Sequence, residues 1–134
     1  LTPHPGEMAR LEVDATTQTV NADRIGTARR FARERGVFVV LKGARTIIAR
    51  PDGLVAICPT GNPGMATAGT GDVLTGMIVG LLAQRVPAWE AACAATYFHG
   101  LAGDLASQHL GQPGMLASDL ISQIPYALQR TKTT

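Results

Sequence analysis

Five consecutive apolar residues, Val37 to Leu41, restrict the possible folds of this chain more than any other segment. Gly36 precedes the run and Gly43 follows it closely. A strand without polar alternation needs burial on both faces, as in a parallel sheet that is covered by helices. Residues 37–41 therefore predict an inner strand of an α/β fold.

A β-hairpin is expected after this strand. Residues 46–50 and 54–58 are mostly apolar, and Pro51-Asp52-Gly53 separates them. Asp and Gly tolerate the positive φ angles that tight hairpin turns require. The pattern therefore predicts two strands joined by a turn at Asp52-Gly53.

Helices are expected on both sides of these strands. Asp23 is a suitable N-cap and Gly36 a suitable terminator for one helix, and Ser118 is a suitable N-cap for another. Pro87 stands where the first turn of a helix accepts proline. The predicted helices cover residues 7–13, 23–35, 72–84, 88–109 and 118–130.

This succession of helices, one inner strand and one hairpin indicates an α/β architecture. One strand and one hairpin are too little sheet for a complete α/β domain. We therefore expect residues 1–134 to form part of one larger domain, without an internal boundary. A solitary part of this kind should expose much of its sheet and fold poorly.

Composition restricts the classes of partner. The chain is 46% hydrophobic and 16% charged, which suits a globular fold with a core. Its net charge of +2 argues against nucleic-acid binding, and the arginines of residues 29–35 fit a solvated helix face. No apolar run is long enough to span a bilayer. Cys58 and Cys93 lack metal-ligand spacing and indicate a reducing compartment, so we expect a cytoplasmic protein. Together with the charge and the apolar runs, this predicts neither a membrane nor a nucleic-acid partner.

A glycine-rich loop leads into the apolar helix predicted from Asp72. Gly69 and Gly71 have small neighbours, so the backbone there can approach a ligand closely. Amides at a helix amino terminus are unpaired and carry partial positive charge, which favours phosphate. The loop is not a Walker motif, because no Lys-Ser/Thr pair follows the glycines, and not a dinucleotide fingerprint, because no strand leads directly into it.

Asp72 gives this phosphate site a chemical function. A carboxylate beside bound phosphates is unfavourable unless it accepts a proton or meets a metal ion. In phosphoryl transfer, its useful role is that of the general base for the attacking hydroxyl. The alternative is that Asp72 only caps the helix, and the preceding residues 62–68 favour the catalytic role.

Three segments resemble a known family in order and spacing. Residues 62–76, Asn-Pro-Gly-Met-Ala-Thr-Ala-Gly-Thr-Gly-Asp-Val-Leu-Thr-Gly, resemble the signature of the ADP/ATP-dependent NAD(P)H-hydrate dehydratases, a carbohydrate-kinase-like family. Residues 1–11 resemble the other signature of that family, and residues 42–46 match its nucleotide-contacting turn. Residues 117–120 are a weaker fourth match.

The resemblance implies a ribokinase-like α/β fold, with a central, mostly parallel sheet flanked by helices. The family's catalytic domain is about twice as long as this chain, so the chain would be its carboxyl-terminal half and the missing half would precede Leu1. Many bacterial relatives carry an epimerase domain before that half. A homo-oligomer, commonly a tetramer, is also implied.

The resemblance implies a metabolite-repair reaction. ADP or ATP phosphorylates the hydroxyl of hydrated NAD(P)H (NADHX or NADPHX), and loss of phosphate then restores NAD(P)H. The expected partners are NAD(P)HX and an adenine nucleotide, and the expected metal is Mg²⁺.

The resemblance also assigns the substrate residues. Asp72 would take the proton of the ring hydroxyl and contact NAD(P)HX, and His4 would touch the same substrate. Glu7 stands where related kinases carry an acidic residue that organises metal and water, so magnesium held through water is expected there. His99 and His109 are ten residues apart on one predicted helix, cannot form a metal pair, and are interpreted as structural.

The nucleotide is expected to contact two segments. Residues 42–46 would hold it at the carboxyl end of the predicted inner strand, where open α/β sheets bind ligands. Thr70 and Gly71 would donate backbone N–H groups to the transferring phosphate. For Asn62 and Met65, ligand contact and loop structure stay open as alternatives. The expected nucleotide and phosphate residues are Lys42, Gly43, Ala44, Arg45, Thr46, Asn62, Gly69, Thr70 and Gly71.

Two other functions share part of this pattern. A ribokinase-like kinase for a small alcohol, such as a vitamin precursor, would share Asp72 and the phosphate site but would release a phosphorylated product. Such kinases more usually have Asn at the position of His4, so His4 favours the dehydratase. A non-catalytic nucleotide-binding module would tolerate loss of the base, so Asp72 argues against it.

Overall fold

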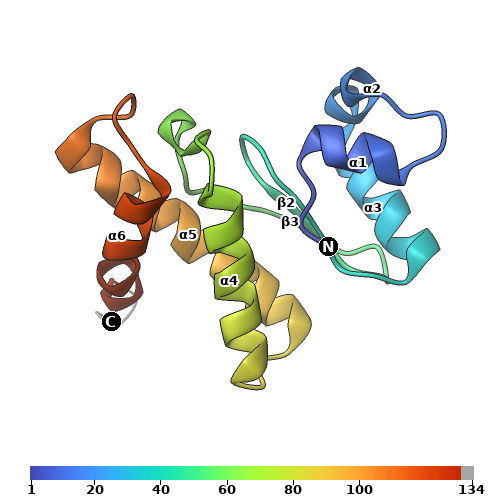
Figure 1. Ribbon diagram of the computed structural model, residues 1–134. Helices are drawn as coiled ribbons and strands as arrows, with labels where there is room; N and C mark the ends of the chain where they lie inside the picture. Colours follow the sequence, from blue (N-terminus) through green and yellow to red (C-terminus); the bar gives the residue numbers. More distant parts are fainter. Residues whose placement is uncertain (131–134) are drawn as a thin grey trace. The chain divides into compact units, whose positions relative to one another are not determined.

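The computed structural model describes residues 1–130 and is shown in Figure 1. The chain packs as two compact units, Leu1–Cys58 and Pro59–Thr134, and each is described by itself. The expectation of a single half-domain without an internal boundary stays a prediction.

The amino-terminal unit places helices against a small sheet. Its helices are α1 (Pro5–Leu11), α2 (Thr17–Ala22) and α3 (Arg24–Arg35), and its strands are β1 (Val39–Leu41), β2 (Ile47–Ala49) and β3 (Val55–Ile57), in the spatial order β1-β2-β3. Both strand pairs are antiparallel. Met8 of α1 and Phe31 of α3 are buried in the same core cluster as Leu41 and Ile47.

β1 has a second neighbour on its other edge. The nitrogen of Leu1 donates to the carbonyl of Phe38, the amide of Val40 donates to the carbonyl of Leu1, and the amide of Lys42 donates to the carbonyl of Pro3, each at 2.8 Å. This alternation is the pattern of a parallel ladder. Residues 1–3, which are not assigned as a strand, thus run parallel to β1 along its other edge. The predicted inner strand is confirmed as β1, although it begins at Val39 and its sheet neighbour β2 is antiparallel.

Local signals placed α3 and the hairpin correctly. The Asp23 carboxylate accepts a hydrogen bond from the amide of Gly26 at 2.8 Å, and Gly36 ends the helix at φ 65°. The hairpin turn contains Gly53 at φ 92°. α1 begins at Pro5, two residues before the predicted start, and ends at Leu11.

Helix α2 was not predicted. A reciprocal cap starts it: the amide of Thr19 donates to the Thr16 hydroxyl at 3.1 Å, and the amide of Thr16 donates to the Thr19 hydroxyl at 2.9 Å. The helix has six residues and buries only Val20, so it carries no periodic apolar pattern.

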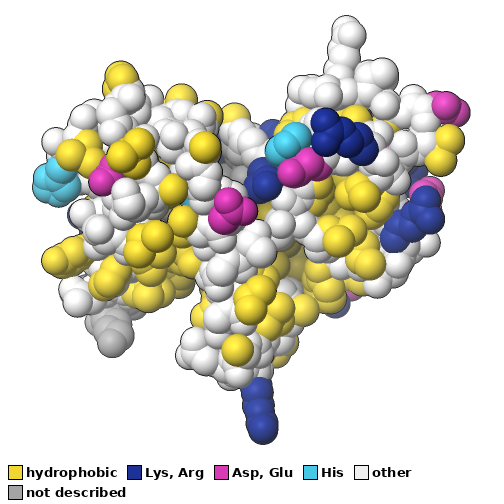
Figure 2. Space-filling model, in the orientation of Figure 1, with side chains coloured by type: hydrophobic (Ala, Val, Ile, Leu, Met, Phe, Trp, Pro, Cys, Tyr) yellow, Lys and Arg dark blue, Asp and Glu magenta, His cyan; other side chains and the backbone are white. Residues whose placement is uncertain are grey.

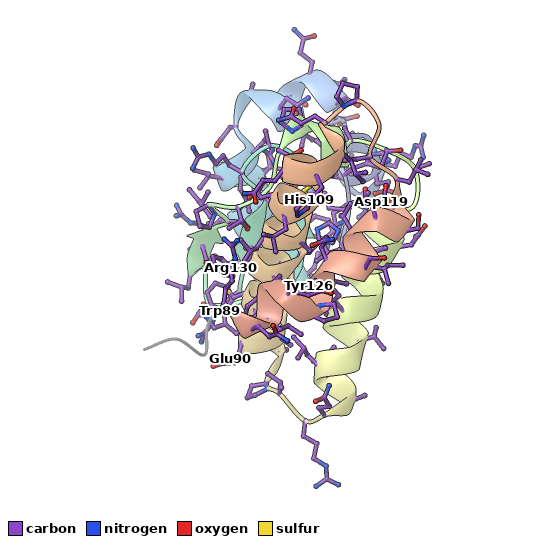
Figure 3. All side chains as sticks on the ribbon, turned by 90° about the vertical axis from the view of Figure 1, so that its left-hand side faces the viewer. Trp89, Glu90, His109, Asp119, Tyr126 and Arg130 are labelled. Atoms are coloured by element: carbon purple, nitrogen blue, oxygen red, sulfur yellow. The ribbon has the colours of Figure 1, made fainter. Side chains whose placement is uncertain are left out.

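The described part of the carboxyl-terminal unit consists of helices and the loops between them. It contains the 3₁₀ turn η1 (Pro63–Met65) and the helices α4 (Thr70–Ala83), α5 (Ala88–Leu110) and α6 (Ala117–Gln129). α5 packs against both α4 and α6, and Figure 3 shows α6, with Asp119 and Tyr126, beside α5. Ala102, Leu105 and Ala127 form one of the buried clusters between α5 and α6.

Two predicted helix starts in this unit were displaced. α6 begins at Ala117, so the prediction of Ser118 as N-cap was wrong; instead the carboxylate of Asp119 accepts a hydrogen bond from the amide of Leu116 at 2.8 Å. α4 begins at Thr70, two residues before Asp72, because Gly69 at φ 89° turns the chain into the helix.

Candidate functional site

The glycine-rich loop of the carboxyl-terminal unit is held by one carboxylate of α5. The two oxygens of Asp104 accept hydrogen bonds from the amide of Gly61 at 2.9 Å and from the side-chain amide of Asn62 at 3.0 Å. The side-chain oxygen of Asn62 in turn accepts from the amide of Gly64 at 3.0 Å. Every polar atom of the Asn62 amide group thus has a structural partner, which favours the loop-structure alternative for this residue.

Two glycines of α5 provide the surface on which the loop lies. A Cβ atom at Gly100 would lie 2.7 Å from the carbonyl carbon of Thr60, and one at Gly103 would lie 2.3 Å from the sulfur of Met65. A side chain at Gly100 would push the loop away from α5, and one at Gly103 would displace the Met65 side chain. Met65 is therefore seated against α5, which supports a structural role for it.

The side chain of Thr70 locks the start of α4. Its hydroxyl lies 2.8 Å from the carbonyl of Met65 and 2.9 Å from that of Thr67, and the residue is buried. The hydroxyl is therefore committed to the loop. The backbone amide makes only a long contact of 3.5 Å with the Thr67 carbonyl, which leaves it close to unpaired.

The tip of α4 carries an available amide and an exposed carboxylate. The amides of Asp72 and Val73 both donate to the carbonyl of Gly69 at 3.1 Å. Within residues 1–130 the amide of Gly71 has no acceptor, and the carboxylate of Asp72 has neither a hydrogen bond nor an ion pair. Asp72 is exposed in the first helical turn. Unpaired amides favour an anion here, and the neighbouring carboxylate can accept a proton.

His99 of α5 contacts the backbone of Thr70, the first residue of α4. Its Nε2 lies 2.9 Å from the carbonyl of Thr70, and because a carbonyl only accepts, Nε2 carries the proton. Burial lowers the pKa of His99, and the bond to Thr70 opposes this less strongly. His99 is therefore neutral and structural, whereas His109 is exposed near the end of α5 (Figure 3).

His4, Glu7 and Lys42 of the amino-terminal unit lie together. The amide of Glu7 donates to Nδ1 of His4 at 3.1 Å, and the amide of His4 donates to the Glu7 carboxylate at 2.6 Å, so the two residues cap α1 reciprocally. The Lys42 ammonium is 3.5 Å from the same carboxylate. Figure 2 shows a histidine against acidic and basic side chains on this unit.

The contacts of this cluster determine the charge of Glu7. His4 accepts through Nδ1, so the neutral ring carries its proton on Nε2, which lies 3.4 Å from the other Glu7 oxygen. The backbone hydrogen bond from His4, and then the charge of Lys42, hold the pKa of Glu7 below its ordinary value. Glu7 is therefore an anion. Within residues 1–130 no group of three or more His, Cys, Asp or Glu residues could hold a metal, so Glu7 offers a single carboxylate, which fits a contact with metal-bound water.

The turn after β1 is shaped by Arg24. The guanidinium donates to the carbonyls of Leu41 and Lys42, each at 3.2 Å, and also to the carbonyl of Ala44. Gly43 at φ 139° and Arg45 at φ 56° form the turn between them. The hydroxyl of Thr46 closes it by donating to the carbonyl of Gly43 at 3.1 Å.

The expected site residues thus fall into two groups. One is the cluster of His4 and Glu7 with residues 42–46, and the other is the loop and helix tip from Asn62 to Asp72. Sequence analysis missed Arg24, Asp104 and the two α5 glycines. The signal for the last three is Gly100-Leu101-Ala102-Gly103-Asp104, small residues and a carboxylate inside an alanine-rich helix.

The structure also bears on membrane association. None of the helices formed by residues 1–130 is long and apolar enough to cross a bilayer.

Comparison with protein families gives one match that covers most of the chain. The family model Carb_kinase, described as NAD(P)H-hydrate dehydratase, matches residues 1–126.

Curated relatives match nearly the whole chain. The bifunctional NAD(P)H-hydrate repair enzyme Nnr of Moorella thermoacetica is 54% identical over 129 residues, which are 96% of this chain and 24% of the relative. The ADP-dependent (S)-NAD(P)H-hydrate dehydratase of Neisseria meningitidis serogroup B is 47% identical over 121 residues, 90% of this chain and 40% of the relative. The chain therefore spans less than half the length of these relatives.

Solved structures match the fold. The ADP/ATP-dependent NAD(P)H-hydrate dehydratase from Bacillus subtilis, co-crystallized with ATP/Mg²⁺ and soaked with CoA, has a TM-score of 0.92 at 37% identity, over 97% of this chain and 48% of that one. A ribokinase-like superfamily protein from Enterococcus faecalis V583 has a TM-score of 0.75 at 32% identity, over 96% of this chain and 43% of that one. These matches confirm the ribokinase-like fold class.

Proposed function

The chain belongs to the NAD(P)H-hydrate dehydratase family, and on that basis we propose that it supplies the carboxyl-terminal half of an enzyme that restores NAD(P)H from its hydrates with ADP or ATP. The observation that carries this proposal is the tip of α4. There the exposed carboxylate of Asp72 directly follows the unpaired amide of Gly71. An anion site next to a proton acceptor suits phosphoryl transfer to a hydroxyl group.

Asp72 is the general base in the proposed reaction. The ring hydroxyl oxygen attacks the terminal phosphorus of the nucleotide, its proton passes to Asp72, and the bond between that phosphorus and the nucleotide breaks. The phosphorylated ring then loses phosphate from one carbon and a proton from the adjacent carbon, which restores the double bond. The net result is NAD(P)H, inorganic phosphate and a nucleotide one phosphoryl group shorter.

The amides of Thr70 and Gly71 stabilise the migrating phosphoryl group. Charge spreads over its oxygens in the transition state, and preorganised N–H donors are effective there. Because the hydroxyl of Thr70 is engaged with the loop, the donation is assigned to backbone atoms. Gly69 belongs to the same site because it forms the turn with which α4 begins.

The amino-terminal unit contributes to nucleotide and substrate binding. Residues 42–46 bind the nucleotide, with Lys42 supplying positive charge, and His4 contacts the hydrated dinucleotide. Mg²⁺, when bound with the nucleotide, neutralises phosphate charge. Glu7, an anion beside Lys42, suits a water-mediated contact with that metal.

Further partners of the complete protein also belong to this proposal. Several relatives, including that of Moorella thermoacetica, are named bifunctional, which supports a second activity, and an epimerase is the expected one. A homo-oligomer and a cytoplasmic location remain predictions.

A product assay tests the proposed function. The complete protein is incubated with hydrated NADH, magnesium and either ADP or ATP, and NADH absorbance is followed together with phosphate release. We expect NADH and phosphate in equal amounts. Stoichiometric phosphorylation of a small alcohol, with no NADH formed, would instead support the kinase. The comparisons favour the dehydratase, because the family model and the relatives described above are named for it.

A further inference from the structure

Arg24 occupies an unusual place for a cation. It is the first residue of α3, where the partial positive charge of the helix amino terminus disfavours an arginine. Its Nε is buried, and among the buried side-chain nitrogen and oxygen atoms of the described residues it is the one without a hydrogen-bond partner. Neither feature stabilises α3, so helix stability does not explain this residue.

The contacts of Arg24 lie on one turn. Its guanidinium donates to the carbonyls of Leu41, Lys42 and Ala44, which are 17 to 20 residues away in sequence. A Cβ atom at Gly43 would lie 2.9 Å from one guanidinium nitrogen, and the φ angle of Gly43 is 139°, so glycine suits this close approach. A rigid, planar fork is suited to holding several carbonyls at once, and an ammonium group is not.

These contacts fix the direction of the turn's amides. A trans peptide unit directs its C=O and N–H to opposite sides, and residues 1–130 contain no cis peptide bond. The carbonyls of Lys42 and Ala44 point to Arg24, so the amides of Gly43 and Arg45 point away from it. In the described part of the chain neither amide has an acceptor. Arg24 therefore presents two free donors on the outer side of the turn.

We propose that Arg24 is a positioning residue for nucleotide binding: it touches no substrate and instead holds residues 42–45 so that their outward amides and Lys42 meet the phosphates of the nucleotide. This inference rests on the proposed function, because it assigns that turn to the nucleotide. It predicts a selective effect. Loss of the fork should weaken nucleotide binding and leave binding of the hydrated dinucleotide unchanged.

The test uses Arg24→Lys in the complete protein, with Arg29→Lys as the matched control. Arg29 is an exposed arginine of the same helix. We expect the KM and the directly measured Kd for ADP or ATP to rise about tenfold in Arg24→Lys, the size expected for lost hydrogen bonds to a charged group. The KM for hydrated NADH should change less than about twofold, and Arg29→Lys should match the wild type.

A second variant tests the mechanism by rescue. In Arg24→Ala, guanidinium ion at non-denaturing concentration should restore nucleotide affinity, and methylammonium should not. Any one of three results would overturn the proposal: equal weakening of the binding of both substrates, an unchanged nucleotide Kd in Arg24→Lys, or a folded Arg24→Ala whose nucleotide affinity guanidinium does not restore. If Arg24→Ala does not fold, the Arg24→Lys measurements decide. A wild-type protein without nucleotide-dependent NADH formation would instead refute the proposed function.

Discussion

Two aspartates of the carboxyl-terminal unit have opposite surroundings. Asp72 is exposed in the first turn of α4 and has no partner within residues 1–130, whereas both oxygens of Asp104 accept hydrogen bonds from the loop. A carboxylate without structural partners is available for proton transfer. One with two structural partners holds the backbone in place.

Asp104→Asn should damage the loop itself. One side-chain oxygen becomes an NH₂ group, which then faces either the amide of Gly61 or that of Asn62, donor against donor. An unsatisfied pair of this kind costs about 1–3 kcal/mol, so the free energy of unfolding should fall by about that amount and turnover should fall with it. Chemical denaturation of the complete protein, with Asp72→Asn as the comparison, measures this. Equal stability of Asp104→Asn and the wild type would contradict the assignment.

His99 predicts a pH dependence of stability. Its pKa in the folded protein is lowered from 6.5, chiefly by burial, so below that pH the unfolded chain takes up a proton that the folded chain does not. Stability from this residue is therefore complete above pH 6.5 and is lost as the pH falls towards the lowered pKa.

His99→Gln should remove this contribution, because the amide of Gln can still donate to the Thr70 carbonyl but does not titrate. We expect a shallower fall of the unfolding free energy below pH 6.5 in His99→Gln than in the wild type. His109→Gln, at an exposed position of the same helix, is the control and should keep the wild-type slope. The same slope in His99→Gln and the wild type would rule out the predicted coupling.

At the scale of elements, α5 acts as the support for the glycine-rich loop. Residues Tyr97, His99, Gly100, Gly103 and Asp104 each contact the loop or the start of α4. These residues occupy adjacent positions over two turns of one helix, so a shift of α5 would move the whole phosphate site.

The two α5 glycines should respond differently to alanine. At Gly100 the new Cβ would meet backbone atoms of Thr60, which cannot move without displacing the loop, whereas at Gly103 it would meet the end of the flexible Met65 side chain. Alanine also favours a helix over glycine by about 1 kcal/mol. We therefore expect Gly100→Ala to lower the melting temperature and activity, and Gly103→Ala to change both less. A larger loss in Gly103→Ala than in Gly100→Ala would contradict the contact analysis.

Features that depend on neighbouring residues were predicted more often than contacts between distant ones, although the short-range cap of α2 at Thr16 and Thr19 was missed. The Asp23 cap and the Asp52-Gly53 turn act within three residues, and each was predicted from a local pattern. The contacts of Arg24 span 17 to 20 residues, and those of Asp104 span 42 and 43, so a local pattern cannot identify their partners. The run Gly100 to Asp104 marks α5 as unusual but does not say what it contacts. The parallel ladder between Leu1 and β1 spans 37 residues and was missed for the same reason.

At the scale of the whole molecule, the exposed apolar side chains of α4 support the proposal that the chain is one half of a larger domain. Residues 73–83 contain no charged side chain, yet Val79 is 58% and Leu82 is 42% exposed, and apolar side chains of α4 are visible on the surface in Figure 2. A helix that is apolar all round is normally buried. The chain spans 48% of the Bacillus subtilis dehydratase chain, so the remaining half of such a domain is the natural candidate to cover this face.

The most direct test of the central claim is the turnover of Asp72→Asn in the complete protein, measured together with nucleotide affinity. The substitution removes the proton acceptor and keeps the size of the side chain. We expect kcat to fall by at least about 100-fold, the usual contribution of a general base, while the Kd for ADP or ATP stays within about twofold of the wild type. Wild-type kcat in Asp72→Asn would contradict the account.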